Sequence, residues 1–244
     1  MSTATRTRPP AAPASRGATR TPSAPARRAR PGFGAVDWRA TLLALGSLLA
    51  AYGSLHTVLQ DISWWLVGAA FAAGVFLAAA LTRTWTRSRW APPLVAIGLS
   101  ILGVTAGFGG DKAFLGLLPT FESGDAINAV VAQGWESIQE QRVPARPDLG
   151  IVLLLALLMI GCALFADAAV AIVRAPALVA APVLTLLAVP VMVRPGLGDP
   201  LWYLLAAGLF LGVLRIGRRP ASGAVVVLTG AIVLGGSLVA PTFL

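Results

Sequence analysis

Long apolar stretches alternate with short polar connections along most of this chain. Each stretch approaches the length of about 20 residues that an α-helix needs to cross the about 30 Å hydrocarbon core of a bilayer. The stretches cover residues 40–59, 63–82, 91–108, 149–168, 176–193, 200–217 and 222–240. The pattern predicts an all-α membrane protein, a polytopic bundle of about seven transmembrane helices.

Several residues refine these boundaries. Six of the seven Trp fall at predicted borders, where their amphipathic rings favour the headgroup level: Trp38, Trp64, Trp65, Trp85, Trp90 and Trp202. The span 200–217 is the weakest, because its uninterrupted apolar run is only 201–214 and Arg215 must extend toward the polar side. Pro182 is expected to kink the fifth span.

Two of the predicted spans carry a GxxxG pair. Gly103 and Gly107 lie in the third span, and Gly208 and Gly212 in the sixth. Such pairs allow helices to approach closely. They indicate packing within one bundle, with dimerisation as the alternative.

The connection 109–148 is the only long one, and a helix is predicted within it at about 125–142. Apolar residues recur there at three- and four-residue steps, whereas acids and amides occupy the other face. Ser123 or Asp125 is expected to cap its start, and Pro144 to end it. The helix is predicted to lie flat on the outer leaflet or across the mouth of the bundle, with Trp135 pointing down. The alternative is a docking surface for a partner, formed by Trp135, Ile127, Val131 and Ile138.

Charged residues fall on alternating sides of the spans. One side holds 15 of the 19 basic residues, with only Asp37 and Asp167 among the acids; the other side holds the remaining eight acids. Basic connections remain cytoplasmic, so the N-terminus is predicted inside and the C-terminus outside a bacterial plasma membrane.

Most of the basic excess lies in the N-terminal tail. Residues 1–35 contain seven Arg, six Pro and no acid. Such a segment cannot bury enough apolar surface to fold, so residues 1–37 are predicted to be a disordered cytoplasmic tail, followed by a transmembrane domain at 38–244. Contact with anionic lipid is the expected role of the tail, and nucleic acid is not an expected partner.

The chain carries little of the chemistry that catalysis requires. It has one Cys and one His, and Cys162 should lie about 20 Å below the outer end of its helix, whereas His56 lies near an outer border beside Gln60 and Asp61. No metal-ligand cluster or phosphate-binding loop is present in the sequence. We therefore expect no enzyme activity, no metal and no cofactor. The predicted spans hold no charge near their centres, which argues against an ion-coupled transporter.

From Gly134 to about Arg194 the sequence resembles the N-terminal membrane region of bacterial TgpA-type transglutaminase-like membrane proteins, in their actinobacterial form. An outer amphipathic stretch with Pro144 and Pro147 and a long apolar helix ending at Asp167 carry the resemblance. So does the Arg174-Ala175-Pro176-Ala177-Leu178 entry to the next helix, with Pro182 and Pro190 following.

In that family an extracytoplasmic transglutaminase-like domain follows the membrane region. The resemblance implies that this chain anchors and positions such a domain, which would begin beyond Leu244 on the outer side. Its catalytic Cys, His and Asp have no counterparts here. Two alternatives stay open: a small permease or channel component, and an assembly protein that docks a partner through the outer helix.

Overall fold

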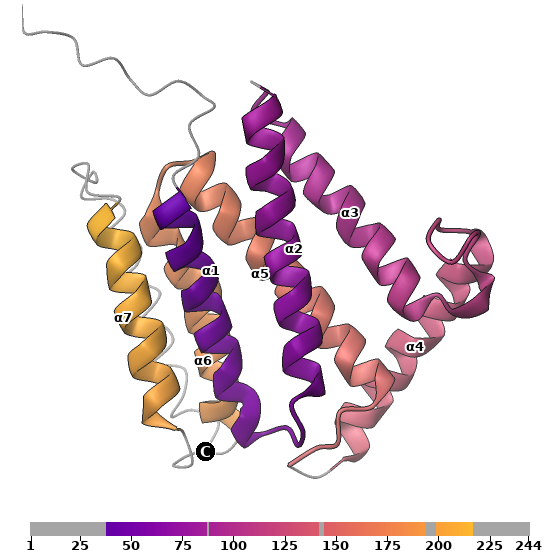
Figure 1. Cartoon of the computed structure of the whole chain (residues 1–244). Coiled ribbons are helices and arrows are strands. Elements are labelled where there is room, and N and C mark those ends of the chain that lie inside the picture. Colours follow the sequence, from indigo (N-terminus) through magenta and orange to yellow (C-terminus); the bar gives the residue numbers. More distant parts are fainter. Residues whose placement is uncertain (1–37, 87, 142–143, 194–198, 217–244) are drawn as a thin grey trace, which may run out of the picture. The chain divides into compact units, whose positions relative to one another are not determined.

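A computed structural model of the chain describes residues 38–86, 88–141, 144–193 and 199–216. Most of these residues form seven helices (Figure 1): α1 (Trp38–Gly53), α2 (Ser63–Trp85), α3 (Ala91–Phe108), α4 (Phe121–Glu140), α5 (Leu149–Ala171), α6 (Ala180–Val193) and α7 (Pro200–Ile216). Short 3-10 turns follow α1 (η1, Ser54–Thr57) and α3 (η2, Gly110–Lys112) and precede α6 (η3, Pro176–Val179). The described part of the chain contains no strand, and the predicted all-α class is confirmed.

Five helical segments are long and apolar enough to cross a membrane. They are α1 with η1, α2, α3, α5, and η3 with α6, and they contain 18 to 23 residues each. The α7 helix is also apolar but has 17 residues. The predicted seventh span, 222–240, and the basic tail, 1–37, lie outside the described residues.

The helices pack as two groups that share a centre. Helices α2, α3 and α5 contact one another, and α6 and α7 pack against α1. Contacts of α1 with both α2 and α5 join the groups (Figure 1). The α4 helix packs mainly on α5, next to the end of α3. The core is made largely of Ala, Leu and Val, whose small or smooth surfaces let helices pack closely without a polar driving force.

Trp64 is the largest side chain in this core. It is 1% exposed, and its ring meets Tyr52 edge-on with a centroid separation of 5.0 Å. The Tyr52 hydroxyl donates to the Trp64 carbonyl at 3.1 Å, and the Trp64 Nε1 donates to the Asp61 carbonyl at 2.9 Å, so both polar side-chain atoms of the pair have partners. Trp64 therefore holds α1 to α2. The prediction that its ring lies at a lipid interface is wrong, because the side chain is buried. Trp85 and Trp90, at the opposite ends of their helices, are exposed.

In the fifth predicted span, the prolines occupy other places in the helix than expected. Its first turn is η3, and the α-helix begins at Ala180, so Pro182 lies in the first turn of α6, where a backbone N–H has no helical acceptor. Pro182 therefore breaks no helical hydrogen bond, and the physical reason for expecting a kink there does not apply. Pro190 is the proline inside the helix.

The GxxxG pairs contribute one glycine each to packing within the bundle. Gly103 faces the Phe71 ring of α2, and Gly212 faces Leu43 of α1. A Cβ added at Gly107 or Gly208 would meet open space.

Candidate functional site

Helix α4 begins earlier than predicted. Thr120 is its N-cap: the Thr120 Oγ1 accepts from the Ser123 amide at 3.1 Å, and the Ser123 Oγ accepts from the Thr120 amide at 2.8 Å. This reciprocal pair is a capping box, which satisfies two backbone donors that a helix start leaves open. The Thr120 hydroxyl also donates to the Lys112 carbonyl at 2.8 Å, which ties the helix start to η2. The expected cap at Ser123 or Asp125 is wrong, and so is an end set by Pro144, since α4 ends at Glu140.

A pair of glycines brings α4 into backbone contact with α5. A Cβ added to Gly134 would lie 2.5 Å from the Gly150 carbonyl carbon, and one added to Gly150 would lie 2.3 Å from the Gly134 nitrogen. Real side chains do not tolerate such distances, so both positions require Gly at this crossing.

Asp148 fixes the same contact with its carboxylate. One carboxylate oxygen accepts from the Ile151 amide at 2.8 Å and caps α5, and the other accepts from the Ser137 hydroxyl of α4. The two oxygens of one carboxylate thus join the start of α5 to α4. The capped start of α5 and the side of α4 form one clamped unit.

The predicted interaction residues fall into two sets. Ile127 and Val131 pack against the core, whereas Trp135 is 62% exposed and Ile138 is 52% exposed. The edge of α4 that faces the bundle follows Ser123, Ile127, Val130 and Gly134. Trp135 therefore points away from the bundle and not down into it.

A second apolar surface precedes α4, and sequence reasoning missed it. Phe114, Leu115, Leu117 and Leu118 are all exposed in the segment between η2 and α4. Leu115 and Gly116 both adopt a positive φ, and Phe114 pairs with Leu118 in an isolated antiparallel bridge. The sequence signal for this surface was the run of apolar residues around Gly116. The tight turn displays these side chains instead of burying them.

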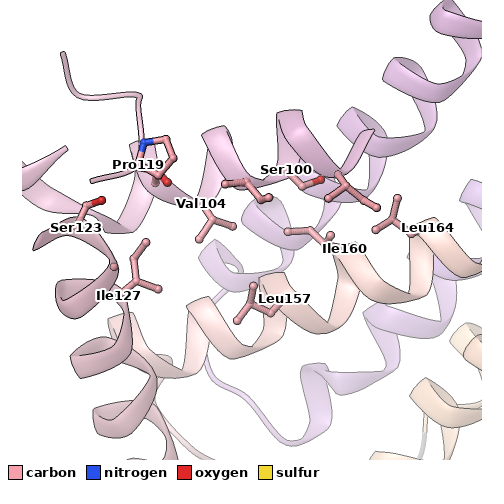
Figure 2. A pocket seen from close by; sticks show the side chains of 12 residues that line it. Ser100, Val104, Pro119, Ser123, Ile127, Leu157, Ile160 and Leu164 are labelled. Atoms are coloured by element: carbon pink, nitrogen blue, oxygen red, sulfur yellow. The ribbon is translucent and has the colours of Figure 1, made fainter. Parts of the chain in front are cut away.

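A cavity of about 270 Å³ lies between α3, α4 and α5 (Figure 2). Val104 and Ser100 line it from α3, Ile127 from α4, and Leu157 and Ile160 from α5. Its walls are almost entirely apolar, because Ile, Leu and Val side chains form most of the lining, and the Ser100 hydroxyl donates to the Ala96 carbonyl at 2.8 Å. Such walls can hold an apolar group, but they offer no polar path for a solute.

His56 and its neighbours tie three connections together on one side of the bundle. Its Nε2 lies 3.6 Å from an Asp199 carboxylate oxygen just before α7, and its Nδ1 lies 3.1 Å from the Gly53 carbonyl. Gln60 bonds instead across the chain, through its side chain to the Pro144 carbonyl and through its amide to the Ala145 carbonyl. The predicted grouping of His56 with Gln60 is therefore replaced by two separate contacts.

A buried ion pair joins α2 to α5 near the opposite ends of these helices. Arg83 binds the Asp167 carboxylate through both guanidinium nitrogens, with Nη1 and Oδ1 2.9 Å apart. The Asp167 side chain is 5% exposed. The sequence places these residues 84 positions apart, so only the fold reveals the pair. Both charges satisfy each other, as charges within spanning helices require.

The described residues offer no assembled catalytic centre. Cys162 is buried within α5, and His56 lies on the side of the bundle where α5 begins, far from the middle of that helix. No group of three or more His, Cys, Asp or Glu side chains that could hold a metal occurs in the part of the chain that the structure describes.

The chain was compared with protein families, curated proteins and solved structures. A search of curated proteins and a search of solved structures each found no match. The family model of the TgpA N-terminal domain matches residues 46–244, which covers most of the chain and all of α2 to α7. The chain therefore belongs to the TgpA N-terminal domain family.

Proposed function

We propose that this chain is the membrane-anchoring N-terminal portion of a transglutaminase-like envelope protein, and that it positions an extracytoplasmic domain. The clamp between α4 and α5 is the observation that carries the proposal. It holds an amphipathic helix rigidly between two apolar helices, and a rigid platform at a membrane surface is what the positioning of a neighbouring domain requires. The chain performs no catalysis of its own in this role.

The charge distribution supports an orientation with α4 outside, the N-terminus in the cytoplasm and the C-terminus outside a bacterial plasma membrane. The α4 helix carries four acids and no base: Glu122, Asp125, Glu136 and Glu140. At the opposite ends of the spans, the Asp167 charge is cancelled by Arg83. The Arg residues of the connections on that side, such as Arg87 and Arg89, then leave a net positive charge there.

A permease or channel component is the less favoured candidate. A solute pathway needs polar groups or water along the bundle, whereas the cavity between α3, α4 and α5 has apolar walls, and the Ser100 and Ser123 hydroxyls that line it donate to backbone carbonyls. The core around Trp64 is filled with side chains.

Assembly with a partner through the outer surface is the second candidate. Its support is the exposed apolar side chains on α4, Phe121 and Trp135, and in the segment before it, Phe114 and Leu115. Exposed apolar side chains of this kind gather at interaction sites or at membrane interfaces. This candidate and the anchor proposal are compatible, because a docked extracytoplasmic domain is itself a partner.

Labelling of introduced cysteines tests the orientation. In a Cys162→Ala background, Leu115→Cys places a thiol in the exposed segment before α4, and Ser88→Cys places one in the connection between α2 and α3. A membrane-impermeant maleimide applied to intact cells should label Leu115→Cys only, and Ser88→Cys should react after permeabilisation. The reverse pattern would overturn the proposed orientation.

A further inference from the structure

The cavity between α3, α4 and α5 is a trough with a buried floor and an exposed rim. Its floor is formed by Ser100, Val104 and Ile160, each of which is 8% exposed. Its rim includes Ile101 of α3 and Leu157 of α5, which are 49% and 40% exposed. Because the rim side chains line the trough and are also exposed, the trough opens onto the surface of the bundle.

The long axis of the trough follows the two helices that form its sides. Its lining extends over residues 97–105 of α3 and 157–164 of α5, a length of about 10–12 Å at 1.5 Å per residue. Figure 2 shows these side chains directed into the space between the two helices, with Ser123 and Ile127 of α4 at one end. The shape is therefore that of a channel for an extended molecule, closed at one end by α4.

The exposed face of α3 leads directly to this rim. Leu94, Ile97 and Ile101 are all exposed, and their steps of three and four residues place them on one side of the helix. Both α3 and α5 are long and apolar enough to cross a membrane, so this side of α3 faces the hydrocarbon of a bilayer. The trough is continuous with that lipid-facing surface.

Water is a poor occupant of this space. The Ser100 and Ser123 hydroxyls that line it donate to the Ala96 and Thr120 carbonyls, at 2.8 and 2.9 Å. Most of the other lining side chains are aliphatic. Apolar cavities of this kind stay dry and take up apolar molecules, and about 270 Å³ is far more empty space than packed protein interiors tolerate. The trough requires an apolar occupant.

We propose that one acyl chain of a membrane phospholipid occupies this trough. An extended hydrocarbon chain matches a narrow apolar space that runs along two spanning helices, and the bilayer supplies such chains at the open rim. The bound chain completes the packing of α4 against α3 and α5. This inference goes beyond the anchor role proposed above and requires only that α3 and α5 cross a membrane.

Photo-crosslinking from the lipid tests the proposal on the full chain. The protein is reconstituted into vesicles of phosphatidylethanolamine and phosphatidylglycerol, in which a small share of the phosphatidylglycerol carries a diazirine in the middle of one acyl chain. Illumination joins this chain to the residues that it touches, and peptide mass spectrometry locates them. We expect adducts on the exposed Leu94 and also on Val104 and Ile160, which are too deeply buried for the lipid around the bundle to reach.

Two substitutions fill the trough from opposite sides. Val104→Phe fills it from α3, and Ile160→Phe fills it from α5; each should reduce the adducts on the remaining floor residues severalfold. Leu94→Phe is the matched control, because it introduces the same side chain on α3 at an exposed position outside the trough, and it should leave the floor adducts unchanged. Adducts on the exposed Leu99 should persist in all three variants, which separates filling of the trough from unfolding.

The lipid that copurifies with the protein provides a second measurement. Native mass spectrometry in detergent should show one bound phospholipid for the unchanged chain and for Leu94→Phe. The occupied fraction should be severalfold lower for Val104→Phe and Ile160→Phe.

Three results would overturn the proposal. The first is a set of adducts restricted to exposed residues, because the floor would then be closed to lipid. The second is floor labelling that survives both Val104→Phe and Ile160→Phe. The third is copurification of a free fatty acid, or of no lipid, with the unchanged chain, because a phospholipid would then not be the occupant.

Discussion

At the scale of single residues, two pairs of residues constrain this fold most strongly. The Gly134–Gly150 contact leaves no room for a Cβ on either helix, so it sets how closely α4 can approach α5. The Arg83–Asp167 pair removes two charges from an apolar surrounding by binding them to each other. Substitutions at these positions should have larger effects than substitutions nearby, because neighbouring residues take part in neither the backbone contact nor the ion pair.

Replacing Gly134 with Leu should separate α4 from α5. The added side chain meets the Gly150 backbone, which cannot move aside as a flexible side chain can. Overpacking of this kind costs about 1–3 kcal/mol of unfolding free energy. Thermal unfolding in detergent should show a lower Tm, and limited proteolysis should cut more readily between α3 and α4. Gly161→Leu is the matched control, since a Cβ at Gly161 meets open space. Equal effects of the two substitutions would contradict a special role for the glycine crossing.

Removing one member of the ion pair should be more harmful than removing both. Arg83→Ala leaves the Asp167 carboxylate buried without its partner, at a cost of about 3–5 kcal/mol. The Arg83→Ala, Asp167→Ala double variant leaves no unpaired charge and should recover part of that loss. A double-mutant cycle on unfolding free energies measures the coupling. Additive losses would show that the two side chains do not stabilise each other.

At the scale of elements, α4 depends on its capped start and on the side that it turns toward α5. Thr120 supplies the cap and also reaches back to η2, so one hydroxyl connects the end of α3 with the start of α4. The position of α4 is therefore set by contacts with both α3 and α5.

Thr120→Ala should loosen the first turn of α4. It removes an N-cap, which costs about 1 kcal/mol, and it leaves the Ser123 amide without its acceptor. Faster hydrogen exchange at the amides of residues 121–124 is the expected readout, and Thr120→Ser should restore protection. Thr185→Ala serves as the control, because the Thr185 hydroxyl bonds only within α6. Unchanged exchange in Thr120→Ala would mean that packing alone holds the first turn.

Trp135→Asp should leave the bundle intact. Its side chain is 62% exposed, so the substitution removes little buried surface, and Tm should stay close to that of the unchanged protein. If the Tm falls as it does for Gly134→Leu, Trp135 contributes to packing. An unchanged Tm combined with loss of an associated domain or partner would assign Trp135 to an interaction surface.

The sequence predicted the existence of α4 better than its orientation. Apolar periodicity identifies a helix with one buried side, and that expectation is confirmed. The buried edge lies along Ile127, Val130 and Gly134 and not along Trp135, because closest approach is set by the smallest residue, to which hydrophobicity patterns give little weight. The Arg83–Asp167 pair was beyond sequence reasoning for another reason: it depends on which helices become neighbours, and spans of similar hydropathy do not reveal their neighbours.

At the scale of the whole molecule, the described residues form a bundle of apolar helices with one amphipathic helix, α4, clamped to the start of α5. Membership of the TgpA N-terminal domain family and the five span-length helices agree with one another. The central claim is that this bundle presents both α4 and the C-terminus to the outside, where an extracytoplasmic domain can be held. That claim requires an odd number of spans from a cytoplasmic N-terminus.

A pair of reporter fusions after Leu244 tests that claim most directly. One reporter is active only outside the plasma membrane and the other only in the cytoplasm, and each is fused to the full chain. The account predicts activity of the first reporter and silence of the second. A fusion to Ile216, the end of α7, is the control and should give the opposite pattern, because one span fewer precedes it. Cytoplasmic activity after Leu244 would contradict both the orientation and the anchoring role.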